Sequence, residues 1–305
     1  MSKKNVIIIG TLLILLKACT IVFAQGEGDK YILGSQKMLL NANTIECDIR
    51  IETVVDGKEH SARGNYKEQA LSRKTLGQPA PFMRSTFRLH LSMNSLSPGS
   101  DEQNQMTIVC RPQANGERSL IERYTCIEGV KSFTVIDLVR LEEKLKMTNR
   151  ELFFTQVSEV RNLGGLSGMM RQISRFYEFS VHSQENLQDD EMIPTLKLTG
   201  QLRNVHHKAL LERFGGTDKN GNYPLNFPSD MEVWLGRHDD FPYKIRYLRR
   251  ISENSERKEL LFQETLFNVV LDGPPIPVED FFPLIPPDGT FTKDDTDDFL
   301  KSLGL

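Results

Sequence analysis

Apolar and polar residues alternate along several stretches of the first half of the chain. The clearest stretch is TIECDIRIETVV, in which charged residues separate the apolar positions Ile45, Cys47, Ile49 and Ile51. A period of two is typical of a strand with one buried face. The Asp-Gly pair that follows favours a two-residue hairpin turn, so residues 59–69 are expected to return as a second, more polar strand.

Four further strands are expected before residue 138. MRSTFRLHLSMN alternates in the same way and places on one face Phe87, Leu89, Leu91 and Met93. MTIVC, SLIERYTCIEG and VKSFTVID follow after short polar turns. Sequential antiparallel strands joined by short turns form a meander.

Helical spacing predicts three helices among these strands. GDKYILGSQKMLLNA precedes the first strand and offers as apolar positions Ile32, Met38, Leu39 and Leu40. DLVRLEEKLKM spaces Leu138, Leu141 and Leu145 for one face, with Asp137 as the N-cap, and RELFFTQVSEV is a candidate continuation.

The third helix is GGLSGMMRQISRFYEF, which carries a methionine-rich stripe. Its apolar positions are Leu166, Met169, Met170, Ile173 and Phe176 or Tyr177. Ordinary core packing explains such a stripe, and a soft lid over an apolar cavity is the functional alternative, because methionine side chains adapt to irregular surfaces.

Strands resume at TLKLTGQLR, with one face formed by Leu196, Leu198, Gly200 and Leu202, and a short helix, NVHHKALLERFG, ends at a glycine pair. The hairpin MEVWLGRHDDFPYKIRYLRR then presents on one face Met231, Val233, Leu235, Phe241, Tyr243, Ile245 and Tyr247. Trp234 falls on the opposite face. RKELLFQETLFNVVL is the last long strand expected.

Prolines exclude regular structure across GPPIPVEDFFPLIPP, and the acidic KDDTDDFLKSL is expected to be a solvated tail. The chain shows neither an internal repeat nor a long flexible linker. We therefore expect one mature domain, residues 25–305, with a proline-rich, acidic C-terminal tail.

The first residues indicate export. Two lysines, an apolar run from Val6 to Leu16 and a small-residue ending at Ala24 have the order of a signal peptide, residues 1–24. The apolar run is too short for a comfortable membrane span. A competing interpretation is a bacterial lipobox in which Cys19 is acylated, although Lys17 is a poor residue within it.

Composition narrows the function classes. The 305 residues have a net charge of −3 and 39% hydrophobic residues, and the mixed charge gives no electrostatic case for nucleic acid. An exported compartment permits one disulfide and one leftover thiol among Cys47, Cys110 and Cys126, with the pairing open. No CxxC pair argues for redox catalysis or a zinc ribbon.

The histidines and acidic residues do not form a recognisable chemical site. His238, Asp239 and Asp240 are expected in a polar turn, and the adjacent His206 and His207 of a helix do not share a face. DKNGNYPLNFPSD departs from a calcium loop at Tyr223 and Ser229, so a surface turn is expected there. No nucleophile elbow, phosphate loop or dinucleotide fingerprint occurs, and we expect no metal and no cofactor.

Five stretches together resemble one family. They are IECDIRIETVVDGKEHSARGNY, GGLSGMMRQI, LKLTGQLRNVHHKALLERF, PSDMEVWLGRHDDFPYKIRYLRR and VVLDGPPIPVEDFFPLIPPDGTFTKDDTDDFL. Their order over residues 35–300 is similar to that of the periplasmic lipoprotein carriers LolA and LolB, and most similar to the larger secreted LolA-like proteins of planctomycete-type bacteria. The resemblance implies an α+β fold, a half-open antiparallel β-barrel with helices covering its concave face.

The resemblance also implies a function without covalent chemistry, because the family's carriers hold lipoprotein acyl chains in an apolar cavity. The residues that would line such a cavity here are Ile45, Ile49, Ile51, Phe87, Leu89, Leu91, Met169, Met170, Val233, Leu235, Tyr243, Ile245 and Tyr247. A filled core would use the same residues. No functional arginine of the carriers can be matched to a position in this chain.

Three hypotheses follow. The first is a non-enzymatic, monomeric protein of the periplasm or cell envelope that binds lipid or lipoprotein acyl chains. The second is a structural or interaction module with a filled cavity and an envelope protein partner. The third is a secreted hydrolase with a dispersed site, for which the sequence offers no nucleophile.

Overall fold

The structure is a computed structural model that describes residues 26–55, 57–71, 85–93, 104–112, 119–148, 165–188, 192–281 and 292–302. The expected signal peptide, Cys19 and RELFFTQVSEV lie outside these ranges. None of the helices in the described ranges combines the length and apolar composition that a membrane span requires.

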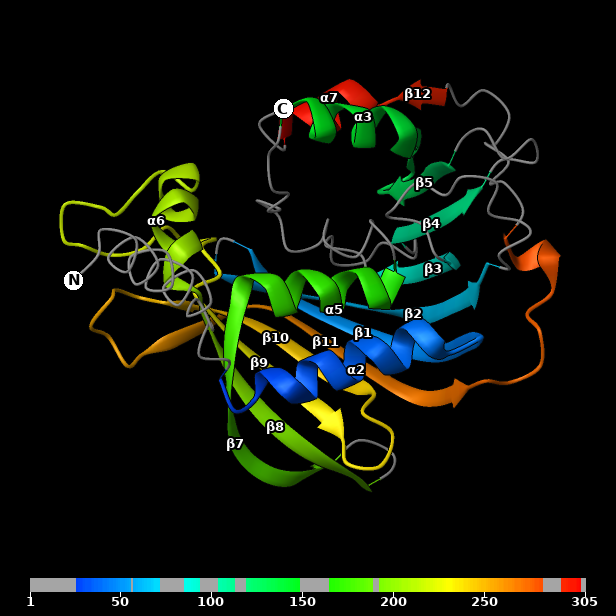
Figure 1. The fold of residues 1–305 in the computed structure, drawn as a ribbon. Coiled ribbons are helices and arrows are strands. Elements are labelled where there is room, and N and C mark those ends of the chain that lie inside the picture. The colour runs from blue at the N-terminus through cyan, green and yellow to red at the C-terminus, as the bar shows by residue number, and fades with distance from the viewer. Residues whose placement is uncertain are drawn as a thin grey trace, which may run out of the picture.

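Within these ranges the chain forms one sheet in the order β12-β6-β5-β4-β3-β2-β1-β11-β10-β9-β8-β7 (Figure 1). The strands are β1 (Thr44–Val55), β2 (Lys58–Ala70), β3 (Ser85–Met93), β4 (Asn104–Pro112), β5 (Ser119–Ile127), β6 (Val130–Asp137), β7 (Tyr177–Gln188), β8 (Met192–Leu202), β9 (Asp230–Gly236), β10 (Pro242–Arg250), β11 (Lys258–Leu271) and β12 (Thr292–Asp294). The helices are α2 (Asp29–Asn41), α3 (Leu138–Thr148), α5 (Gly165–Phe176), α6 (Asn204–Arg213), α7 (Thr296–Ser302) and the 3₁₀ turn η1 (Val278–Phe281).

Two meanders build the sheet. β1 to β6 pair in sequence order, and β7 to β11 do the same, so that β11 returns beside β1. Every pair is antiparallel except that of β12 with β6. β7 and β12 each have one neighbour in the sheet, and the sheet is therefore not closed. The mostly antiparallel α+β arrangement expected from the sequence is confirmed.

The hairpin between β1 and β2 follows from its turn sequence. Val55 pairs with Lys58, which leaves a two-residue loop, and Gly57 has a φ of +75°. Glycine adopts this left-handed conformation at little cost, and such turns match the twist of the two strands. The turn thereby sets the register in which β1 pairs with β2.

Helices α2 and α5 lie together against one side of the sheet, which we call the inner face (Figure 1). The apolar positions of the alternating strands join the buried residues of both helices in one core, which includes Ile32, Leu39, Ile45, Ile49, Phe87, Leu89, Leu91, Leu166, Met169, Met170, Ile173, Leu198, Val233 and Ile245. The period-two assignments of these strands are confirmed.

The opposite side, the outer face, has a different cover. Residues 273–281 of the proline-rich segment lie against it, and η1 contacts β3 and β4. Arg88 donates a hydrogen bond to the carbonyl of Asp280 at 3.1 Å, and Lys67 bonds the Asp280 carboxylate at 2.8 Å. Ile276 and Phe281 are buried there. Residues 273–281 are irregular apart from η1, as the prolines predict. The rest of the predicted segment, residues 282–287, lies outside the described ranges.

Two parts of the sequence prediction differ from the structure. Residues 177–188 form β7, although only the end of a helix was expected there. The acidic end of the chain folds as β12 and α7 rather than as a solvated tail. Phe299 and Leu300 enter the core, while Arg140 pairs with Asp294 at 3.1 Å and with Asp297 at 2.7 Å. The apolar pair and these ion pairs together hold the segment.

Candidate functional site

All of the predicted cavity-lining residues lie on the inner face. Most are buried, and Ile51 and Tyr243 are partly buried. Strand register brings several of them into one row across the sheet, from Ile51 through Glu264, Ile245 and Val233 to Leu198. Residues far apart in sequence thus form one largely apolar surface, and whether they bind a ligand remains a prediction.

Glu264 interrupts this apolar row, and the sequence prediction missed it. Its side chain lies between the core residues Phe262 and Leu266 along β11 and is 1% exposed. The sequence did contain a signal for this position. Glu264 alternates with Phe262 and Leu266 in LLFQETLF, so a strand places all three on the same face. Burying a carboxylate among apolar side chains costs free energy, so Glu264 is a candidate functional residue of the inner face.

Between α2, α5 and the inner face, the described residues leave little space. Helices α2 and α5 run side by side over the inner face, and two small cavities lie at the opposite ends of their seam. The first has about 20 Å³ and the second about 50 Å³. A water needs roughly 10–15 Å³, whereas pockets for drug-sized ligands measure roughly 300–1,000 Å³. Each cavity accommodates a few waters at most.

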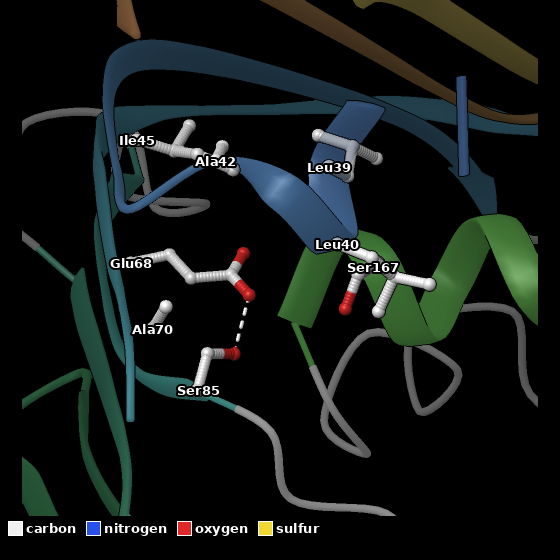
Figure 2. Close-up of a pocket in the computed structure, with 8 residues that line it drawn as sticks. All are labelled: Leu39, Leu40, Ala42, Ile45, Glu68, Ala70, Ser85 and Ser167. Atoms are coloured by element: carbon white, nitrogen blue, oxygen red, sulfur yellow. Dashed lines mark hydrogen bonds between the residues drawn. The ribbon is translucent and has the colours of Figure 1, made fainter. Parts of the chain in front are cut away.

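Figure 2 shows the first cavity, where the N-terminus of α5 meets β2 and β3. Its lining residues are Leu39, Leu40, Ala42, Ile45, Glu68, Ala70, Ser85 and Ser167. The Glu68 carboxylate accepts hydrogen bonds from the hydroxyls of Ser85 and Tyr66, the latter at 2.6 Å. Both Glu68 and Tyr66 are buried.

The same polar group holds the start of α5. The backbone N–H of Leu166 lies 3.0 Å from the Tyr66 hydroxyl and 3.3 Å from Glu68 Oε2. A carboxylate at a helix N-terminus satisfies otherwise unpaired N–H groups and interacts favourably with the helix dipole. We call Tyr66, Glu68 and Ser85 the α5 anchor.

The second cavity lies at the other end of the seam and is lined by Asp29, Ile32, Leu33, Ser174 and Arg203. Arg203 pairs with the buried Asp29 at 2.7 Å and also donates to the carbonyl of Ser174, near the end of α5, at 3.4 Å. Asp29 accepts the backbone N–H of Phe179 at 2.8 Å. This ion pair therefore ties the start of α2, the end of α5 and β7 together.

Trp234 occupies the outer face, as its parity predicts. It is buried, but it packs under the cationic groups of Lys197, Lys244 and Arg246, which lie 4.8, 5.3 and 5.1 Å from its ring. Its Nε1 donates to Glu185 at 2.9 Å. Cation–π contacts and this hydrogen bond explain how an aromatic residue is buried away from the apolar core.

His238, Asp239 and Asp240 form the expected turn between β9 and β10. Asp239 accepts hydrogen bonds from the Phe241 N–H at 3.0 Å and from the Tyr243 hydroxyl at 2.7 Å. Asp240 has a φ of +56°, and burial, together with the negative charge of Asp239, raises its pKa. The Asp239 carboxylate stabilises the turn, and the described residues around His238 form no metal-binding group.

The remaining polar candidates also have structural roles. Asp218 accepts the backbone N–H groups of Asn220 and Asn222, both at 2.8 Å, in a surface turn that confirms the interpretation of this loop. In the part of the chain that the structure describes, no three His, Cys, Asp or Glu side chains gather as a metal site would require.

The cysteines differ from the expectation of one pair. No disulfide joins Cys47, Cys110 and Cys126 to one another. Cys110 pairs with Ile121 and Cys126 with Gln105 in the β4–β5 register, so these two thiols are not opposite each other. Burial raises the pKa of Cys110, which makes it a poor nucleophile.

One hydroxyl–imidazole contact bears on the hydrolase hypothesis. His90 Nδ1 lies 2.9 Å from Thr107 Oγ1, and burial, with the positive charge of Arg88 adding, lowers the pKa of His90. A nucleophile and base of this kind need a third group that orients the base and donors for an oxyanion. The described neighbours of this pair supply Arg88, a cation, rather than an orienting carboxylate.

Comparison with known proteins finds only distant structural similarity. No family model matches it, and no curated protein matches it. A DUF1329 family protein from Desulfovibrio piger has 8% identity over 84% of this chain and 95% of its own, with a TM-score of 0.34. MucB, solved in complex with MucA(peri), has 10% identity over 82% of this chain and 57% of its own, with a TM-score of 0.36.

A third solved structure is the LolA superfamily protein NE2245 from Nitrosomonas europaea. It has 9% identity over 84% of this chain and 97% of its own, with a TM-score of 0.25. It belongs to the superfamily that the sequence resembles. Likenesses with TM-scores below 0.5 define neither the fold nor the activity, and the site is therefore interpreted from its own geometry.

Proposed function

We propose that this protein is a non-enzymatic, monomeric protein of the periplasm or cell envelope that binds an apolar ligand, lipid or lipoprotein acyl chains, against the inner face of its sheet. The observation that carries the proposal is the largely apolar inner face of the sheet from β3 to β8, interrupted on β11 by Glu264, beneath a separate helical cover. The cover contributes a methionine pair, Met169 and Met170, and methionine repacks easily around a new occupant.

Helix α5 is the part of the cover that would move aside. Polar contacts hold its two ends, the α5 anchor at the start and Arg203 at the carbonyl of Ser174. Its apolar side chains occupy the volume that an acyl chain would take. Each methylene that replaces them gains about 0.8 kcal/mol from burial, so a long chain can compensate for uncovering the sheet.

Lipid extraction from the protein purified from the exported fraction tests the proposal. Mass spectrometry is expected to find co-purified lipid, and a fluorescent fatty acid is expected to bind and to be displaced by unlabelled lipid. Glu68→Gln weakens the α5 anchor, so it should speed uptake of the probe several-fold. Glu279→Gln on the exposed η1 is a control that should leave uptake unchanged. Absence of both lipid and probe binding contradicts the proposal.

A filled interior is the second candidate, and the small cavities favour it. The two cavities at the α2–α5 seam, of about 20 and 50 Å³, are too small for a ligand while α5 stays in place. The protein would then act through its surface as a structural or interaction module. Capture of an envelope protein by a preparation that carries no lipid would support this candidate.

The finer aspects of the family resemblance belong to the same proposal. We infer that the open sheet is a LolA-like half-barrel in a single mature domain, related to the larger secreted LolA-like proteins of planctomycete-type bacteria. Cleavage after Ala24 would leave Gln25 as the first residue, whereas lipidation would leave acylated Cys19. The intact mass of the mature protein distinguishes these two forms.

A further inference from the structure

Strand β7 ends the sheet on one side, and among the described residues only its first half has a cover. The backbone N–H of Gly28 donates to the carbonyl of Phe179 at 2.9 Å, and the N–H of Phe179 donates to Asp29 at 2.8 Å. The backbone groups of Phe179 therefore point away from β8 and are already satisfied. The start of α2 protects this part of the edge.

Beyond a register shift between Val181 and Ser183, the second half of β7 continues without such a cover. Two contacts set its orientation. Thr195 Oγ1 donates to the carbonyl of Glu185 at 2.8 Å, so this carbonyl points toward β8. The carbonyl of Pro194 accepts a hydrogen bond from the backbone N–H of Arg237, so this carbonyl points toward β9. The backbone groups of Asn186, which lies opposite Pro194, therefore point away from β8.

Backbone directions alternate along an antiparallel strand, so Gln184 and Asn186 present their N–H and C=O groups outward. Across the described ranges, nothing forms a hydrogen bond with these outward groups. Natural sheets protect such edges with lysine, proline or a covering element. Residues 183–188 contain neither lysine nor proline. This edge is therefore a template for strand addition.

Charge selects the strand that would fit. Residues 177–188 include Glu178 and Glu185 and neither lysine nor arginine, and the next three residues in the sequence are all acidic. Side chains directly opposite each other across paired strands repel when their charges are alike. A basic segment is favoured over a second copy of this chain, because two β7 strands would bring their acidic residues together.

We propose that the edge of β7 from Ser183 to Gln188 binds an extended, basic segment of a partner protein as an additional strand. Backbone hydrogen bonds from Gln184 and Asn186 supply the attachment, and Glu185 attracts the positive side chains. This surface lies at the side of the sheet and does not use the inner face, so it functions whether or not the interior takes up lipid.

A synthetic heptapeptide of alternating lysine with valine or threonine is the probe, and its glutamate counterpart is the comparison. Fluorescence anisotropy should show binding of the basic peptide only, and hydrogen exchange should slow at the amides of Gln184 and Asn186. Asn186→Pro removes one outward N–H and should weaken binding at least tenfold. Asn186→Ala keeps that N–H and is the matched control, with unchanged binding.

If Asn186→Pro fails to fold, the peptide can be changed instead of the protein. N-methylation removes the backbone N–H donors along one edge of the peptide. Methylation of the edge that pairs with β7 should abolish binding, and methylation of the other edge should not. Equal binding of basic and acidic peptides, or indifference to both methylation and Asn186→Pro, would overturn the proposal. A dimer in sedimentation velocity that Asn186→Pro dissociates would also overturn it, because the occupant would then be a second copy.

Discussion

Gly165 shows how one residue positions the helical cover. It begins α5 with a φ of +61°, and a side chain there would collide with the Tyr66 hydroxyl and the Glu68 carboxylate. Only glycine allows the α5 anchor to approach the first N–H groups of the helix this closely. The Gly-Gly pair in the sequence indicates a turn before the helix, but the sequence does not reveal the buried carboxylate that it contacts.

Gly165→Ala is therefore expected to destabilise the protein more than Gly221→Ala. Gly221 also has a positive φ, +77°, but a side chain there meets nothing within 4 Å. Left-handed strain alone costs about 1 kcal/mol, and the collision with the anchor should bring the cost at Gly165 to about 3 kcal/mol. Urea unfolding of both variants measures the difference, and equal costs would contradict the role of the anchor.

Asp230 is a buried charged residue at the start of β9, at 1% exposed. Arg250 and Lys258 pair with it at 2.7 and 2.8 Å, and Ser229 donates a hydrogen bond at 2.8 Å. Burial raises the pKa of Asp230, but the hydrogen bonds from Arg250, Lys258 and Ser229 outweigh burial and lower the pKa overall.

Stability should therefore depend on pH through this carboxylate. Because its folded pKa lies below the unfolded value, its contribution is complete above pH of about 4 and is lost as pH falls through the folded pKa. Asp230→Asn should cost about 3 kcal/mol at pH 7, since two cations lose their partner. The difference in Tm between the two proteins should shrink below pH of about 4. A constant difference down to pH 2 would count against this account.

At the scale of elements, α3 begins where its N-cap predicts. Asp137 Oδ1 accepts the backbone N–H groups of Val139 at 2.9 Å and Arg140 at 3.3 Å. Asp137 N–H in turn donates to the hydroxyl of Thr296, at the start of α7. One residue thus joins a helix that the sequence predicts to one that it does not.

Asp137→Ala should destabilise the protein by about 1 kcal/mol, because the first turn of α3 loses its acceptor. Asp137→Asn retains a side-chain oxygen and should cost a few tenths of that amount. Thermal unfolding followed by circular dichroism measures both. If alanine and asparagine were equally destabilising, charge rather than capping would be the stabilising feature.

The elements that sequence patterns missed share a physical cause. Strand β7 alternates Tyr177, Phe179 and Val181, but the rest of it is polar apart from Leu187, because an edge strand has little surface to bury. β12 has three exposed residues and depends on β6 for its hydrogen bonds. Such segments take their structure from neighbours that are distant in sequence, and local periodicity carries little of that information.

At the scale of the molecule, the sheet separates two environments. The inner face packs against α2 and α5, and the outer face carries charged side chains around Trp234. A row of side chains crosses the outer face from Glu232 through Arg246 and Gln263 to Glu52. The single tryptophan therefore reports on the outer face and not on the proposed ligand surface.

Binding of an apolar ligand should leave the fluorescence of Trp234 unchanged. A second reporter, Tyr247→Trp in a Trp234→Phe background, places the indole on the inner face and should respond to the same ligand. The environment of Tyr247 includes Tyr177 and Phe262, whose rings would shift when α5 moves. A response from Trp234 alone would place the ligand outside the interior.

The sequence by itself determined the alternating strands, the β1–β2 turn, the cap of α3 and the face on which each of Val233, Trp234 and Leu235 lies, because these depend on the period of two and on local turn and cap chemistry. Only the tertiary structure decided that the acidic end folds and that β7 forms an edge of the sheet. It also decided that α2 and α5 leave cavities of about 20 and 50 Å³ over the inner face. A filled core and an open cavity require the same apolar residues, and only the packing of distant elements distinguishes them.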